Sequence, residues 1–399
     1  MEYLDIFDEP QLQDDITRIQ MHTYSPHTSS FNRNDEIRLS VNNQDALLLP
    51  HKAALYVEGE ITNTSKPNTI PLTNNFIGFL FDILRVEIHG VQVSETRNVG
   101  ITSTIKHYST STLADDIVGK KSCWFAGMTN LDKGKGFSYL IPMRHFSGFF
   151  ETFRGILINP RLEITLLRSK SDENCFMSNT ADATLNINLT KIQLRIPHVH
   201  LSDSKKLMLY KAINDAHKFS ILFREHSLYE FPVASNTSVQ SWTIRSAPLL
   251  ERPRFVVIGF ATNRKNNVKA NASKFDHCSI TNVRLFLNDI MYPYDTFKTD
   301  FDNDNFAIAY HAFNEFKKSY HNNSSEVDTI SMDEFKSSCP FHIIDGEYQN
   351  EMLKSGSIDV RVEFEASKAI PDNTTCYAMI IHDKFIKYDP LNSTVERIL

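Results

Sequence analysis

The first candidate for chemistry is an acidic loop, Asp300–Asn305, in which oxygen-bearing side chains alternate along the chain. This spacing is that of the start of an EF-hand loop, which binds Ca²⁺ through such oxygens. An EF-hand also requires Gly at the sixth position and a bidentate Glu at the twelfth. Here those positions are Asn305 and His311, so the pattern favours a solvated, turn-forming loop over a Ca²⁺ site.

Two groups of histidines have side chains that can serve as metal ligands, proton relays or bases. His198 and His200 would share one face of a strand, and Ser202 and Asp203 follow them. No Gly-x-Ser-x-Gly elbow or His-Glu-x-x-His pair lies nearby, so we interpret this group as a polar strand end that enters a helix. In His277-Cys278 a thiol adjoins a base, but neighbouring residues of a strand point to opposite faces. We therefore interpret that pair as a packed strand entry.

Three basic segments are candidates for binding phosphate or nucleic acid: Lys133–Gly136, Lys120-Lys121, and Arg264-Lys265 with Lys269. The first lacks the Gly-x-x-x-x-Gly-Lys-Ser/Thr spacing that cradles phosphate, and it predicts a flexible hairpin tip. The other two could contact nucleic acid or an acidic neighbouring subunit, but solvated loops are the simpler interpretation. The sequence thus predicts no catalytic residue, no cofactor-binding residue, no metal ligand and no cofactor.

The composition is that of an ordinary globular chain. Its 399 residues are enough for two domains with full cores, and 41% of them are hydrophobic and 23% charged. The net charge of −6 argues against a broad nucleic-acid-binding face, although a local basic patch stays open. No apolar run is long enough to span a bilayer, and the acidic N-terminus does not resemble a signal peptide. The five cysteines are widely spaced without Cys-x-x-Cys, which favours free buried thiols.

Most of the chain alternates apolar and polar residues, as strands with one face toward a core do. Clear examples are Ile37–Val41, Arg161–Arg168 and Leu185–Ile196, and Pro197 is expected to end the last of these. Turn-forming residues between two strands at His89-Gly90 predict a β-hairpin. Strands therefore dominate the expected fold.

Helical periodicity is confined to short segments. The sequence predicts helices in His145–Phe153, Ser202–Ala216 and Ala307–Tyr320, and a short one near Asp14–Met21. The third carries aromatic residues three to four apart, which we interpret as a core stripe rather than a stacking platform. These aromatic residues are Tyr310, Phe313, Phe316 and Tyr320.

The second half of the chain repeats the strand pattern of the first at offsets of 200, 199 and 196 residues. Few identities accompany the matches, which indicates an old duplication, and the period is too long for a solenoid repeat. The sequence therefore predicts an all-β fold of two tandem eight-stranded jelly-roll sandwiches, a double jelly roll, with a few short helices. The matched segments are Leu49–Gly59 with Leu249–Gly259, Leu84–Val91 with Val283–Ile290, and Arg161–Leu166 with Ser357–Val362.

The expected domain division follows from the duplication and from the helix between its halves. Residues 1–30 are expected to form an N-terminal arm, 31–201 the first jelly roll, 202–217 a linker helix and 218–399 the second jelly roll. The arm is acidic and carries a few apolar anchors, so we expect it to order on a neighbouring subunit. Its anchors are Leu4, Ile6 and Phe7.

A set of segments in both halves carries a resemblance to a known family of proteins. These segments are Ile37–Leu39, Asn42–Ala46, Pro50–Lys52, Leu55–Gly59, Leu84–Asn98, Gly100–Thr104, Lys274–Cys278, Ile380–Asp383 and Tyr388–Pro390. They resemble the double jelly-roll major capsid proteins of arthropod virus-like elements related to Polintons and adintoviruses. The resemblance extends over roughly residues 30–399 and has no compact catalytic signature.

The resemblance implies a structural protein and not an enzyme. Such proteins form homotrimers whose six rolls make pseudo-hexagonal capsomers of an icosahedral shell around DNA. The implied partners are other copies of the chain, penton and minor capsid proteins, and DNA only indirectly, with no membrane span. The implied location is the virion, assembled in the host cytoplasm or nucleus without secretion by a signal peptide. The alternatives are a tandem β-sandwich that binds carbohydrate or another ligand, and a glycosidase-like enzyme, which would need two suitably spaced carboxylates.

Overall fold

The structure is a computed structural model of the whole chain. It describes residues 15–43, 46–63, 69–111, 119, 122–125, 129–132, 134–178, 185–215, 218–235, 237–244, 253–321, 330–348 and 358–398. The proposed arm anchors Leu4, Ile6 and Phe7, and the pair Lys120-Lys121, lie outside these residues.

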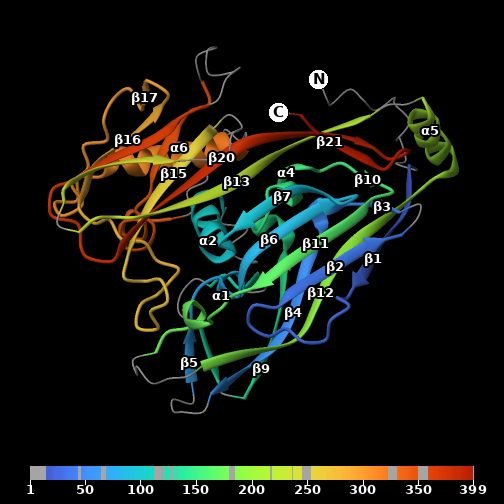
Figure 1. The fold of residues 1–399 in the computed structure, drawn as a ribbon, viewed down its shortest axis with the longest axis horizontal. Helices are drawn as coiled ribbons and strands as arrows, with labels where there is room; N and C mark the ends of the chain where they lie inside the picture. The colour runs from blue at the N-terminus through green and yellow to red at the C-terminus, as the bar shows by residue number, and fades with distance from the viewer. Residues whose placement is uncertain are drawn as a thin grey trace, which may run out of the picture.

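The first half of the chain folds into two antiparallel sheets that enclose one core (Figure 1). One sheet has the order β1-β12-β4-β9 and the other the order β2-β11-β6-β7. Short strands extend the first sheet (β3 and β10) or pair with each other (β5 and β8). The bounds are β1 (Ile16–Tyr24), β2 (Glu36–Asn42), β3 (Leu47–Leu48), β4 (Ala54–Asn63), β5 (Thr69–Leu72), β6 (Phe81–Ile88), β7 (Val91–Arg97), β8 (Thr129–Asp132), β9 (Gly136–Pro142), β10 (Leu157–Ile158), β11 (Arg161–Arg168) and β12 (Leu185–Leu201).

The second half repeats the two main four-stranded sheets of this arrangement. Its sheets have the orders β13-β20-β15-β18 and β14-β19-β16-β17, and β21 pairs with β20. The bounds are β13 (Phe219–Pro232), β14 (Val239–Ile244), β15 (Pro253–Thr262), β16 (Ile280–Leu287), β17 (Ile290–Tyr292), β18 (His342–Asp345), β19 (Val360–Ala366), β20 (Thr374–Asp389) and β21 (Thr394–Ile398).

The two hairpins that the sequence matched occupy equivalent positions in the two halves, which confirms the predicted double jelly roll. The β6–β7 and β16–β17 hairpins each lie at the edge of the smaller sheet of their half. Their turns use positive φ angles, 50° at His89, 78° at Gly90 and 53° at Asn288. Residues that tolerate this left-handed conformation are favoured in tight hairpins. The same turn chemistry has therefore been kept in both copies.

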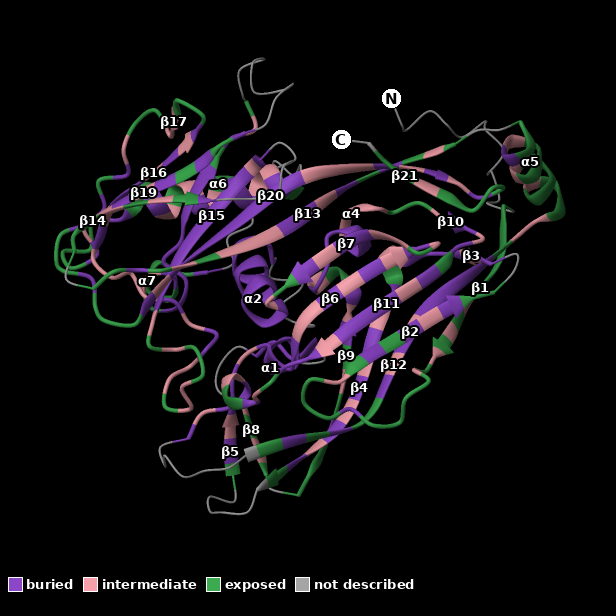
Figure 2. Ribbon diagram, viewed as in Figure 1, coloured by how far each residue is buried: buried purple, intermediate pink, exposed green. Residues whose placement is uncertain are grey.

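Burial follows the predicted alternation on the outer sheets and departs from it at the centre. Strands such as β2 and β19 bury every second residue, as a sheet with one wet face does. In contrast, β15 and the middle of β20 are buried on both faces (Figure 2). Helices and the first jelly roll cover the outer side of their sheet, so these strands are apolar almost without interruption.

The helices cluster between and beside the sheets. They are α1 (Phe76–Phe79), α2 (Val99–Thr110), α4 (Phe149–Thr152), α5 (Asp203–Asn214), α6 (Ala307–His321) and α7 (Met332–Ser338), with 3-10 turns η2 (Pro50–Lys52), η4 (Met143–His145) and η5 (Glu173–Cys175). The helices predicted in Ser202–Ala216 and Ala307–Tyr320 are confirmed as α5 and α6, whereas His145–Phe153 is α-helical only over the single turn of α4. Phe313, Phe316 and Tyr320 of α6 are buried, which confirms their place in the core. None of the described helices is long and apolar enough to cross a membrane.

Helix α2 is fully buried, yet its composition does not predict a helix. It is rich in Val, Ile, Thr and Ser, which have low helix propensity. Its hydroxyls donate to carbonyls one turn earlier, for example Thr104 to Gly100 at 2.7 Å and Ser109 to Ile105 at 2.8 Å. These hydrogen bonds satisfy polar side chains that packing has removed from water. Tertiary burial, rather than local preference, therefore stabilises α2.

The helix predicted near Asp14–Met21 is wrong, because residues 16–24 form β1 and pair with the end of β12. The segment predicted as an arm thus contains a strand of the first jelly roll. Removing residues 1–30 would therefore remove this strand as well. The conformation of residues 16–24 is decided by pairing with β12 and not by the local sequence pattern.

The expected end of a strand at Pro197 is also wrong, because β12 continues to Leu201. The Pro197 carbonyl accepts a hydrogen bond from the Leu49 N–H at 3.1 Å. The backbone nitrogen and carbonyl of a strand residue point toward the same neighbouring strand, so the nitrogen of Pro197, which has no hydrogen, also points toward Leu49. On this side of β12 the neighbouring chain forms only the short β3 and the turn η2, and the ladder of backbone hydrogen bonds is already interrupted. Proline therefore removes little pairing here.

Candidate functional site

The candidate functional site is the junction where the two jelly rolls pack together. The first roll contributes α2, α4 and β7, and the second contributes β13 and α6. The backbones of the two rolls come into direct contact at Gly148, where a Cβ atom would lie 1.7 Å from the Arg224 carbonyl oxygen. Beside it, the rings of Phe149 and Phe223 meet edge to face with centroids 5.3 Å apart. Only glycine leaves room for this contact between backbones.

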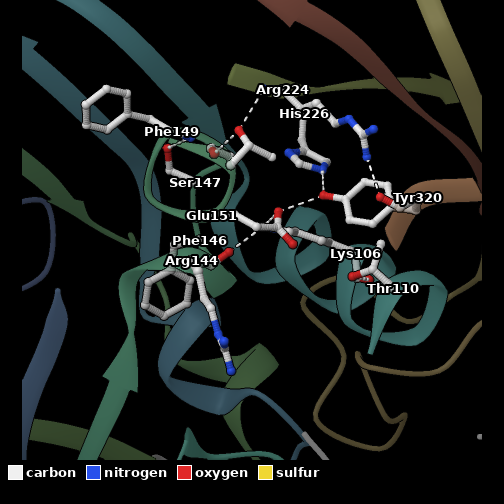
Figure 3. Close-up of polar contacts among 12 residues, drawn as sticks. Lys106, Thr110, Arg144, Phe146, Ser147, Phe149, Glu151, Arg224, His226 and Tyr320 are labelled. Atoms are coloured by element: carbon white, nitrogen blue, oxygen red, sulfur yellow. Dashed lines mark hydrogen bonds and ion pairs between the residues drawn. The ribbon is translucent and has the colours of Figure 1, made fainter. Parts of the chain in front are cut away.

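A chain of polar contacts crosses the junction around Arg224 (Figure 3). The Arg224 N–H donates to the Thr152 hydroxyl at 3.0 Å, and its guanidinium donates to the Tyr320 carbonyl at 2.7 Å. The Tyr320 hydroxyl donates to the Glu151 carboxylate at 2.6 Å, and that carboxylate pairs with the Lys106 ammonium at 2.8 Å. The network thus joins α2 and α4 of the first roll to β13 and α6 of the second.

A second contact fixes β13 against β7. The buried Glu225 carboxylate accepts hydrogen bonds from the Ser94 hydroxyl at 2.9 Å and the Glu95 N–H at 3.1 Å. Farther along, the Tyr388 hydroxyl donates to the Ile158 carbonyl at 2.6 Å. Buried hydrogen bonds of this kind favour one arrangement of the parts that they join. The two rolls are therefore held in one relative orientation.

A cavity of about 770 Å³ opens beside this network. Its two carboxylates among the described residues are both engaged: Glu151 as above, and Asp383 with Arg254 at 3.2 Å. Burial and the neighbouring Glu151 raise the pKa of Tyr320 well above its usual range, so the phenol stays protonated. The arrangement therefore stabilises the junction, and it does not present a poised acid–base pair. The cationic lining residues are Lys106, Arg144, Arg154, Arg224 and Arg254.

The acidic loop Asp300–Asn305 folds as a turn whose two ends hydrogen-bond to each other. Asp300 accepts hydrogen bonds from the side chain and N–H of Asn303, and its own backbone pairs with Asn305. Asp302 pairs with Lys368 at 2.8 Å. No group of acidic, histidine or cysteine side chains within the described ranges could hold a metal ion.

The histidine candidates do not converge on one site. His198 is buried, stacks on His22 with ring centroids 3.9 Å apart, and lies 2.8 Å from the Tyr24 hydroxyl. Burial and the adjacent His22 and His200 lower the pKa of His198 to about 4. His200 instead contacts Gln20. These contacts fasten β1 to β12.

The side chains of His277 and Cys278 also point to different neighbours, as expected. They do so from a turn before β16 and not from a strand. His277 stacks on Phe301, whereas the Cys278 thiol lies 3.4 Å from the Thr262 hydroxyl. Burial raises the pKa of Cys278 to about 11, so it is not a thiolate nucleophile. All five cysteines are free thiols.

The basic candidates among the described residues are mostly neutralised locally. Lys135 pairs with Asp132 at 2.8 Å, Arg264 with Asp276 at 2.6 Å and Lys265 with Glu230 at 2.7 Å. Sequence reasoning did not find the junction residues. A weak signal was present, since β13 carries four polar residues in succession, Arg224–Ser227, and Glu225 and His226 among them are buried.

Acidification is expected to weaken the junction. Burial, with Lys106, His382 and Arg224 nearby, lowers the pKa of His226 well below its usual range, and burial and Lys384 lower that of His382 to about 4. The unfolded chain then binds more protons than the folded chain below pH 6.5, so stability falls as the pH drops toward 4. For His382 the loss by pH 4.5 should be on the order of 2 kcal/mol.

Urea unfolding between pH 7.5 and 4.5 measures this effect. His226→Gln should flatten the pH dependence, while His27→Gln, at an exposed position, should leave it unchanged. An equal slope in all three proteins would contradict the assignment.

A match to a family model defines the class of protein. Residues 70–386 match the double jelly roll-like domain, so the chain belongs to this family. No curated protein matches the sequence.

Solved structures with the same fold come from viruses. The VP54 protein of PBCV-1, fitted into a cryo-EM reconstruction of the virophage Sputnik, is 9% identical, with a TM-score of 0.62 over 98% of this chain and 99% of that chain. The Faustovirus major capsid protein is 8% identical, with a TM-score of 0.62 over 95% and 92%. The mavirus major capsid protein is 9% identical, with a TM-score of 0.53 over 95% and 90%. At these identities the likeness is one of fold.

Proposed function

We propose that this chain is a major capsid protein, structural rather than catalytic, of a virus or virus-like element. The observation that carries the proposal is the hydrogen-bonded pairing of two jelly rolls whose main sheets have matching strand orders. Structures named as major capsid proteins of Faustovirus and mavirus share this arrangement over almost their whole length. The Polinton- and adintovirus-like branch suggested by the sequence resemblance is part of the proposal.

Three copies would form the building unit. A homotrimer places six similar rolls around a threefold axis, which yields a pseudo-hexagonal capsomer that can tile an icosahedral shell. The edge strand β1 supports a subunit contact, since it pairs only with β12 among the described strands and exposes Ile16, Ile19 and Met21. Exposed apolar edge strands are natural pairing surfaces. Penton and minor capsid proteins would be further partners, and DNA would be enclosed without broad direct contact.

The purified chain is expected to be a homotrimer of three 45.8 kDa subunits, with little monomer. Mass photometry and negative-stain imaging would show the trimer and any larger shell. Ile19→Lys should weaken trimers by placing a charge in the contact, whereas Tyr294→Lys, also at an exposed site, should not. A monodisperse monomer at micromolar concentration, or a monomer that binds glycans, would favour a ligand-binding tandem sandwich instead.

A further inference from the structure

Helix α5 presents an unusual apolar surface. Leu207 is 70% exposed, Met208 65% and Tyr210 41%, while Ile213 alone anchors the helix as a buried residue. Solvated helices rarely place large apolar side chains together in water without a partner. The helix lies at one end of the long axis of the molecule, away from the junction (Figure 1).

The same helix is basic. Lys205, Lys206 and Lys211 outnumber its one acidic residue, Asp203. The Lys206 ammonium lies 5.6 Å from the centre of the Tyr210 ring. Tyr210 and Lys211 follow Leu207 by three and four residues, so both lie on the same side of the helix as Leu207. A partner suited to this surface would combine apolar side chains with negative charge.

The N-terminal segment, residues 1–14, has this chemistry. It contains Glu2, Asp5, Asp8, Glu9 and Asp14 and no Lys or Arg, and its apolar residues Leu4, Ile6 and Phe7 lie between the acids. These residues precede the described part of the chain. The charge and the apolar spacing of the segment thus complement those of α5.

The segment also joins the fold beside this helix. The Asp15 carbonyl accepts a hydrogen bond from the Ser202 N–H at 3.0 Å, and the Asp15 carboxylate pairs with Lys205 at 3.3 Å. Helix α5 has 12 residues and is about 18 Å long. Phe7 precedes Asp15 by eight residues, which span up to about 27 Å when extended. The apolar residues of the segment can therefore reach the exposed face.

We propose that α5 is the docking site for residues 2–9 of its own chain, with Leu4, Ile6 and Phe7 covering Leu207, Met208 and Tyr210 and the acidic residues facing the lysines. Attachment beside the helix favours the same chain over a neighbour, because a short tether raises the local concentration to about millimolar. The inference does not depend on a capsid role.

Disulfide trapping tests the contact in the full chain. Phe7→Cys is combined with Leu207→Cys, and the matched control combines Phe7→Cys with Tyr294→Cys, which is 96% exposed and lies beside β17 at the opposite end of the molecule (Figure 1). None of the native thiols is fully exposed. Mild oxidation should link the first pair within one chain about tenfold faster than the control. Links between chains, or equal rates for both pairs, would overturn the proposal.

Hydrogen exchange supplies a readout without new cysteines. Deleting residues 1–14 leaves β1 intact and should increase amide exchange in α5 by about tenfold relative to the full chain. Lys205→Glu with Lys206→Glu should have the same effect through charge. If exchange in α5 is unchanged by the deletion, α5 is not covered by this segment. If anionic lipid vesicles instead protect α5 equally in both proteins, its occupant is a membrane surface and the proposal fails.

Discussion

Replacing Gly148 by alanine is expected to disrupt the junction and to cost about 3 kcal/mol of unfolding free energy. The added Cβ would lie 1.7 Å from the Arg224 carbonyl oxygen and 2.8 Å from its carbon. Both are backbone atoms of β13, so the clash cannot be relieved by turning a side chain. Gly148 has φ near −67°, which alanine adopts freely, and the penalty therefore comes from the contact alone.

The measurement is urea unfolding followed by probes in each roll. Wild-type protein should unfold with the rolls coupled, while Gly148→Ala should separate the transitions because Thr152, Glu151 and Tyr320 lose their alignment. Gly136→Ala is the matched control, since its Cβ would meet only Gly59 at 3.5 Å. Wild-type stability in Gly148→Ala would show that the rolls can shift apart without loss.

Replacing Asp172 by alanine is expected to destabilise the first jelly roll by about 3–5 kcal/mol. The side chains of Asp172 and Arg168 are each only 1% exposed, and they pair at 2.6 Å. Asp172 also accepts hydrogen bonds from Arg33 and from the Ile187 N–H, and Arg168 donates to the Leu80 carbonyl. Without the carboxylate, the guanidinium would stay buried with only carbonyl partners, which is costly.

Chemical denaturation monitored in the first roll measures this loss. Asp172→Asn should cost less, since the amide keeps an acceptor but not the charge. Glu315→Ala is the control, because its pair with Lys318 at 2.8 Å is half exposed and should contribute no more than about 0.5 kcal/mol. Equal effects of Asp172→Ala and Glu315→Ala would refute a structural role for the buried pair.

The strands and the duplication could be predicted from the sequence because both produce patterns within short segments of the chain. Alternation in Arg161–Arg168 reflects one buried face, and the turn residues at His89-Gly90 and Asn288 reflect backbone angles that few residues adopt. These features depend on neighbours within a few residues. The double jelly roll and its hairpins were therefore predictable.

Segments whose conformation depends on distant partners were not predictable. Residues 16–24 form a strand because β12 offers its edge, and Val99–Thr110 form a helix because packing covers it on all sides. Pro197 remains within a strand because the ladder is already interrupted on the side it faces. In each case tertiary contacts outweigh local propensity.

By itself, the sequence determined that this protein is a pair of β-sandwiches of one fold, since periodicity and turn chemistry are local properties repeated in both halves. Only the tertiary structure decided how the two rolls join. Gly148 and Glu151 lie far from Arg224 and Tyr320 in the chain, and none of the four belongs to a recognisable motif. These residues come into contact only when α4, β13 and α6 pack together. The same packing buries their hydrogen bonds, which are stronger away from water.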